Sequence, residues 1–172
     1  MMRIILYLII FATVFGCGYR AVDFSERKEK NELNEVFCIK EFNVPLGEPT
    51  AYDVFYRYIS NAIISAGYKI GCSKKTTKHM YINIRSISVH PIGYSQTQRA
   101  SIYRISVRMN IRVENKKREI LMNKTIFETT QYSGLGLTAE IQRRYAIEEI
   151  AKILEVRVFN LLTHKDKFME EE

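Results

Sequence analysis

The strictest pattern in the chain is an alternation of apolar and polar side chains between residues 103 and 113. The apolar set is Tyr103, Ile105, Val107, Met109, Ile111 and Val113, and the residues between them are Arg104, Ser106, Arg108, Asn110 and Arg112. Because successive side chains of a strand point to opposite faces of a sheet, this period of two predicts a strand with one face in the core and one open face.

Two segments have the apolar periodicity of helices. The first is expected between an N-cap at Thr50 and a terminating Gly67, and its apolar stripe is Phe55, Ile59, Ala62, Ile63 and Ala66. The second is expected from about Ala139 to Leu162 with Thr138 as its cap, and its buried stripe is Ile147, Ile150, Leu154, Val158 and Leu161.

Four further runs have the composition of strands. They span residues 36–44, 68–71, 81–89 and 119–132, and the last should form an antiparallel hairpin with the alternating strand. A change of parity predicts a bulge near Arg85 and Ser86, and residues 91–100 are expected to form a ten-residue loop. The fold class predicted is α+β: a two-layer sandwich, with two helices packed on one face of a mixed, mostly antiparallel sheet of four to five strands.

The first seventeen residues are typical of an exported protein. A cationic start at Arg3 precedes an apolar run of twelve residues, which is shorter than the ~20 that a helix needs to cross a bilayer. The run ends at Val14-Phe15-Gly16-Cys17, which resembles the bacterial lipobox, where the Cys is acylated; an ordinary signal peptide with an incidental Cys is the alternative. The residue after Cys17 is Gly18 and not Asp. By the sorting rule known for enterobacterial lipoproteins, in which Asp at this position retains the protein in the inner membrane, an outer-membrane destination is favoured. The expected organisation is a signal peptide over residues 1–16, a lipidated tether over 17–33, one domain over 34–163 and a charged tail over 164–172.

Two cysteines remain after Cys17, and the sequence leaves their state open. In an oxidising compartment, Cys38 and Cys72 can form a disulfide that closes a loop of about 34 residues and contributes roughly 3–4 kcal/mol. The alternative is two buried thiols, each packing as a small hydrophobic side chain.

Motifs for catalysis are absent from the sequence. His79, His90 and His164 have no partner at metal-ligand spacing, and Gly134-Leu135-Gly136 has no Lys behind it to complete a phosphate-binding loop. We therefore expect a protein that is not an enzyme and that needs no cofactor or metal.

Charge placement is the remaining signal in a chain with 26 Lys and Arg against 19 Asp and Glu. Arg104, Arg108 and Arg112 occupy the open face of one strand about 13 Å apart, and Arg85 and Lys124 are expected to join them. Arginine grips phosphates with two hydrogen bonds, so this face suits the phosphates of lipid A or a protein partner; a solvated sheet face is the alternative. No nucleic-acid partner is expected in the periplasm.

Four features together resemble the family of LPS-assembly lipoproteins, LptE. They are Gly16-Cys17-Gly18-Tyr19 at the acylation site, Phe42-Asn43-Val44-Pro45 before the first helix, the strand pair 103–113 and 119–132, and Arg143-Arg144-Tyr145-Ala146 at the start of the last helix. The order and spacing of these parts are more specific than any one of them.

The resemblance implies a lipoprotein on the periplasmic side of the outer membrane. It would plug the barrel LptD, assist the assembly of that barrel and bind lipopolysaccharide for delivery to the outer leaflet. Family members contact lipopolysaccharide through a basic residue between the two central strands, which is Arg99 here, and through a Lys before the last helix, where this chain has only Arg143 and Arg144 nearby. The alternative function is a lipid-anchored interaction module of another periplasmic envelope assembly.

Overall fold

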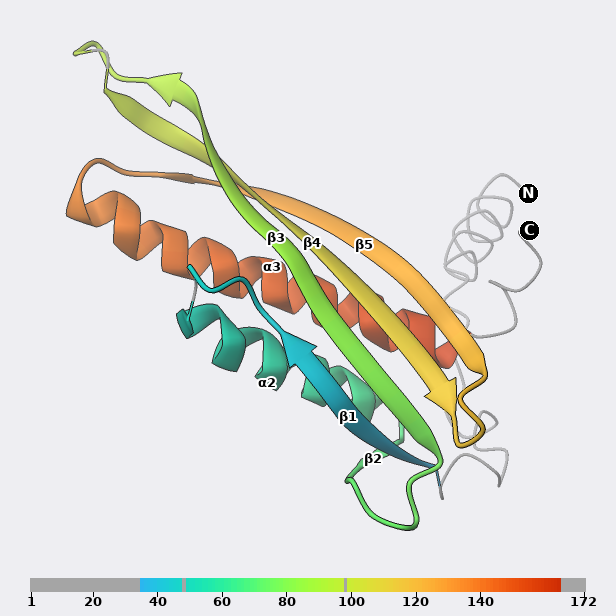
Figure 1. The fold of residues 1–172 in the computed structure, drawn as a ribbon. Helices are drawn as coiled ribbons and strands as arrows, with labels where there is room; N and C mark the ends of the chain where they lie inside the picture. Colours follow the sequence, from blue (N-terminus) through green and yellow to red (C-terminus); the bar gives the residue numbers. More distant parts are fainter. Residues whose placement is uncertain (1–34, 48, 98, 165–172) are drawn as a thin grey trace, which may run out of the picture. The chain divides into compact units, whose positions relative to one another are not determined.

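The computed structural model describes residues 35–47, 49–97 and 99–164. The expected signal peptide, the tether with Cys17 and nearly all of the expected tail lie outside the described residues. With the labels of Figure 1, the elements are β1 (Val36–Asn43), α2 (Pro49–Ser65), β2 (Lys69–Ile70), β3 (Lys78–Tyr94), β4 (Ala100–Asn115), β5 (Ile120–Ser133) and α3 (Leu137–Thr163). In this part of the chain, neither helix is long and apolar enough to cross a membrane.

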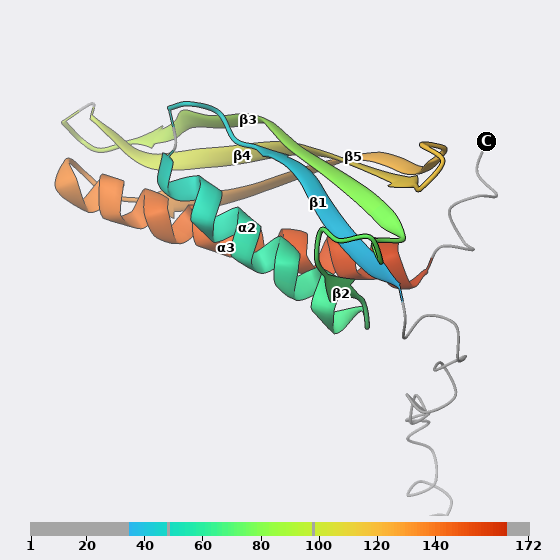
Figure 2. The same cartoon turned by 60° about the horizontal axis from the view of Figure 1, so that its bottom comes forward.

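The predicted two-layer α+β architecture is confirmed. Five strands form one sheet in the order β2-β1-β3-β4-β5. β1 is parallel to β2 and β3, whereas β3, β4 and β5 form an antiparallel meander. Helices α2 and α3 lie side by side on one face of the sheet, and no helix or strand of the described residues covers the other, open face (Figures 1 and 2).

The core lies between the sheet and the two helices. The apolar residues of β4 from Ile105 to Ile111 are fully buried, as the alternation predicts. Helix α2 contributes Phe55, Ile59 and Ile63 to the same cluster. The buried stripe of α3 ends at Leu162 rather than at the predicted Leu161, and it otherwise contains the predicted residues together with Ala146 and Ala151.

The connection between β3 and β4 is shorter than the predicted ten-residue loop. Pro91 pairs with Tyr103 and Tyr94 pairs with Ala100, so most of the expected loop extends the two strands into a long hairpin. Proline has no N–H to donate and is tolerated on an edge strand. β1 pairs with β3 only as far as Asn83, and one side of β3 is therefore an edge where Pro91 lies.

The structure tests three further local predictions: one bulge and two helix caps. The register of β3 shifts between Ile84 and Ser86, which confirms the predicted bulge. Both predicted caps are wrong, because α2 begins at Pro49 and the residue before α3 is Gly136, so Thr50 and Thr138 lie inside the first turns. Gly136 has a φ of 56°, a conformation that glycine adopts without strain.

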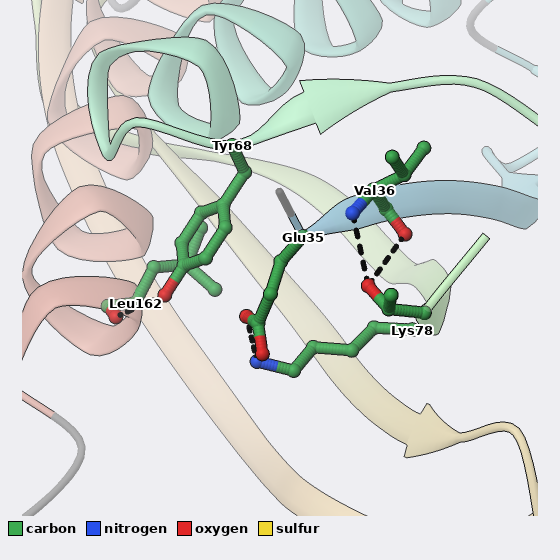
Figure 3. A network of polar contacts seen from close by, with 6 residues as sticks. Glu35, Val36, Tyr68, Lys78 and Leu162 are labelled. Carbon is green, nitrogen blue, oxygen red and sulfur yellow. Dashed lines mark hydrogen bonds and ion pairs between the residues drawn. The ribbon is translucent and has the colours of Figure 1, made fainter. Parts of the chain in front are cut away.

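A polar network fastens the start of the domain to β3 and to the end of α3 (Figure 3). Lys78 points to the core side of the sheet, is 8% exposed and forms an ion pair with Glu35. Its ammonium group lies 5.5 Å from the ring centre of Phe37 and 5.4 Å from that of Tyr68. The Tyr68 hydroxyl in turn donates a hydrogen bond of 3.3 Å to the carbonyl of Leu162. The carboxylate and the two rings together stabilise a cation on the core side of the sheet.

Cys38 and Cys72 are joined by a disulfide, one of the two states that the sequence leaves open. Their Cα atoms are 4.7 Å apart, and 34 positions separate them in the sequence. The bond ties β1 to the segment that follows β2, which is the shortest strand of the sheet.

Candidate functional site

A column of arginines stands on the open face of β4. Arg104 and Arg108 are exposed, and no carboxylate of the described ranges forms an ion pair with either. The guanidinium of Arg108 lies 5.9 Å from the ring centre of Phe127 on β5. These two side chains therefore present unneutralised positive charge to whatever covers this face.

Arg112 is committed to neighbours on its own domain. Its Nε lies 3.1 Å from a carboxylate oxygen of Glu114, and its guanidinium is 4.6 Å from the ring centre of Tyr81. An arginine held by a carboxylate and a ring has less capacity for an outside anion. The third member of the predicted column is thus the weakest candidate of the three.

Of the two cations expected to join the column, only one does. Arg85 is the extra residue of the β3 bulge and is exposed beside Ser86, the partner of Arg108. Lys124 pairs with the buried Ile111, and its side chain therefore belongs to the helix side of the sheet. The expectation for Lys124 is wrong, because its position in the strand has the parity of the core-facing residues.

Arg99 lies at the tip of the β3–β4 hairpin. The backbone N–H of Ser95 donates to the carbonyl of Arg99 at 2.8 Å and closes the turn. The Arg99 side chain is exposed, and the nearby Tyr94 is 65% exposed. The hairpin therefore presents a cation and an aromatic ring together at its end.

Arg143 is on the other side of the sheet from the arginine column. It lies in the second turn of α3 and lines a cavity of about 370 Å³ with Ile87, Val89, Tyr103, Tyr132, Gly136, Ala139 and Glu140. Its Nη1 is 3.5 Å from a carboxylate oxygen of Glu140. Burial raises the pKa of the Tyr132 hydroxyl, and Tyr103 and Glu140 add to that shift. The five predicted arginines thus do not form one site, because the sheet separates Arg143 from Arg104, Arg108 and Arg112.

Exposed apolar side chains gather around the first half of α3 and the hairpin next to it. Two further hollows of about 380 and 390 Å³ lie along α3, and Tyr145 lines both. The exposed apolar residues of this end are Ile92, Tyr94, Ile102, Leu135, Leu137, Ile141 and Tyr145. We refer to these residues as the apolar end. Sequence reasoning missed it, although Leu137, Ile141 and Tyr145 recur every four residues and mark a second stripe on α3.

The structure offers no alternative site for metal chemistry in the part of the chain that it describes. There, no three His, Cys, Asp or Glu side chains lie close enough to hold a metal ion.

Comparison with known proteins identifies the fold. No protein-family model and no curated protein matches the chain. Among solved structures, it is similar to the rare lipoprotein B from Shewanella oneidensis, with a TM-score of 0.59, 11% identity, and coverage of 79% of this chain and 99% of that one. A minor lipoprotein from Acinetobacter baumannii gives a TM-score of 0.53 at 7% identity, covering 76% and 91%.

A homolog of a neuraminyllactose-binding hemagglutinin from Helicobacter pylori has the same fold. The TM-score is 0.56 at 14% identity, and the match covers 84% of this chain and 89% of that one. At such identities the likeness establishes a shared fold, and two of these three neighbours are lipoproteins.

Proposed function

We propose that this chain is a lipid-anchored outer-membrane lipoprotein of the LptE kind, which binds lipopolysaccharide and acts as plug and assembly partner of the LptD barrel. The observation that carries the proposal is the apolar end, with Arg99 at the hairpin tip and Arg143 and Arg144 on α3. Lipid A combines phosphates with acyl chains. Arginines and exposed apolar side chains at one end of a domain match both parts of such a molecule.

The lipidated anchor at Cys17 rests on independent support. Val14-Phe15-Gly16-Cys17 has the pattern of an acylation site, and the fold is shared with two lipoproteins. Acyl chains on Cys17 would hold the domain at the membrane with about 0.8 kcal/mol for each buried CH₂ group. The domain binds and positions its partners, and no bond is made or broken in this function.

Removing two cations at the apolar end tests the binding of lipopolysaccharide. Arg99→Ala combined with Arg143→Ala should weaken binding of purified lipopolysaccharide by at least about tenfold, because two charge-assisted contacts with phosphate are lost. Isothermal titration calorimetry on the purified protein measures this. Lys117→Ala is the matched control, because Lys117 is an exposed cation in the turn at the other end of β4. If the double variant binds like the wild type, the site is wrong.

A second function is favoured by the open sheet face: docking of a protein of another envelope assembly. Arg104 and Arg108 are exposed and carry no ion pair within the described ranges. Charge reversal at both positions should then abolish capture of that partner from solubilised envelopes and leave lipopolysaccharide binding intact. If the protein instead has the first function, the wild type should capture a large outer-membrane barrel. Depletion of this protein from cells should then lower the amount of lipopolysaccharide at the surface.

A further inference from the structure

The outer edge of β5 is a row of backbone groups with no strand beside it in the described part of the chain. β5 is the last of the described strands in the sheet, and among them only β4 pairs with it. The N–H of Gly134 donates to the carbonyl of Ser101 at 3.0 Å. Because the backbone groups of successive residues in an antiparallel strand point alternately toward and away from the neighbouring strand, this bond shows which residues of β5 face β4. With the register of β4 and β5, the residues whose N–H and C=O point outward are Asn123, Thr125, Phe127, Thr129 and Gln131.

The two edges of the sheet differ in their protection against further pairing. Natural edge strands are usually blunted by bulges, prolines or covering segments. β1 has a bulge between Ile39 and Glu41, and β2 and the disulfide cover its first residues. β5 has no proline and keeps an unbroken register with β4 from Met122 to Ser133. Its edge is therefore regular enough to receive another strand.

We propose that two copies of this chain pair through their β5 edges in antiparallel register, with Ile126 opposite the partner's Ile126. Lys124 and Glu128 lie two residues to either side of Ile126, and both belong to the helix side of the sheet. In this register, each Lys124 faces the partner's Glu128, so two opposite-charge pairs form across the two-fold axis.

Charge selects this register over its neighbours. A one-residue slip would turn the side chains of the second copy to the wrong face. A slip that centres the axis on Thr125 or on Phe127 keeps the faces but sets Lys124 and Glu128 opposite uncharged side chains, so both opposite-charge pairs are lost. A slip that centres the axis on Lys124 or on Glu128 sets like charges directly opposite each other, which destabilises a strand pair. Lys124 has no ion pair within the described ranges, and the Glu128 carboxylate is 2.8 Å from Arg157 Nε and retains lone pairs for a second cation.

Exposed surface along β5 supports the same pairing. Phe127 is 55% exposed on the open face, and in this register it contacts the partner's Thr125 and reaches diagonally toward the partner's Phe127. A hollow of about 530 Å³ lies between β5 and α3 and is lined by both Lys124 and Glu128. No described helix lies beyond the outer edge of β5 (Figure 1).

The pairing is independent of the proposed function, because it needs neither lipopolysaccharide nor a barrel. A single pair of strands buries less surface than a standard protein interface, so the dimer should be reversible and depend on concentration. Pairing would join two sheets into one continuous sheet of ten strands.

Two matched experiments test the pairing on the full chain. Ile126→Cys should give at least about tenfold more disulfide-linked dimer under mild oxidation than Thr130→Cys, because residue 130 faces the partner's Met122 in this register. The wild type shows how much disulfide-linked dimer arises from Cys17 alone. Equal linkage at positions 126 and 130 would overturn the register and the proposal.

Charge exchange tests the same register in solution. Lys124→Glu alone and Glu128→Lys alone should each be monomeric by sedimentation velocity at concentrations where the wild type dimerises. An equimolar mixture of the two variants should regain the dimer, because every facing pair is again of opposite charge. A wild type that stays monomeric, or a mixture that stays monomeric, contradicts the proposal. Circular dichroism of the Lys124 and Glu128 variants checks that each domain remains folded.

Discussion

Replacing Cys38 and Cys72 with alanine is expected to lower the free energy of unfolding by about 3–4 kcal/mol. The disulfide joins residues 34 positions apart, so its loss frees a long loop in the unfolded chain. For a domain of this size, the melting temperature should fall by roughly 10–15 °C. β2 pairs with only Val36 and Phe37 of β1, and the short strand depends on this covalent tie. Thermal melts followed by circular dichroism measure the effect.

The wild-type protein supplies the control for this prediction. In a reducing agent it should lose about as much stability as the double variant loses, whereas the melting temperature of the double variant should not respond to the reductant. If the wild type melts at the same temperature with and without the reductant, the bond contributes nothing and the chain-entropy argument fails for this loop.

The sheet could be predicted from the sequence where a local pattern corresponds directly to burial. The alternation along 103–113 identifies the buried face of β4, because a period of two leaves a strand only one choice of face. The change of parity after Ile84 locates the bulge of β3 for the same reason. These features depend on residues that are close together in the sequence, and such local patterns can be recognised in one sequence.

The ends of elements could not be predicted, because distant residues decide them. Pro91 looks like the end of a strand, but β1 stops pairing with β3 at Asn83, and the proline therefore lies on a free edge where no donor is needed. The caps at Thr50 and Thr138 match a local pattern as well, but the helices begin one or two residues earlier, at Pro49 and Leu137.

The candidate site shows the same limit at a larger scale. The sequence identifies Arg99, Arg104 and Arg143 as cations, and it cannot say that the sheet lies between the last two. The apolar end depends on which stripe of α3 is buried, and that follows from packing against α2, β5 and β4. A helix with two apolar stripes buries one, and the other is left for a ligand or partner.

Leu154→Ala is expected to destabilise the domain by about 2–5 kcal/mol, because Leu154 is fully buried on α3 and its removal leaves a cavity that the core closes only in part. Val156→Ala, two residues along the same helix, removes aliphatic carbon from a side chain that is 59% exposed. Its effect should stay within about 0.5 kcal/mol. Urea unfolding with linear extrapolation compares the two variants at constant m-value. Similar losses from both would mean that α3 does not pack on the sheet through the face containing Leu154, and the stripe that forms the apolar end would then have to be reassigned.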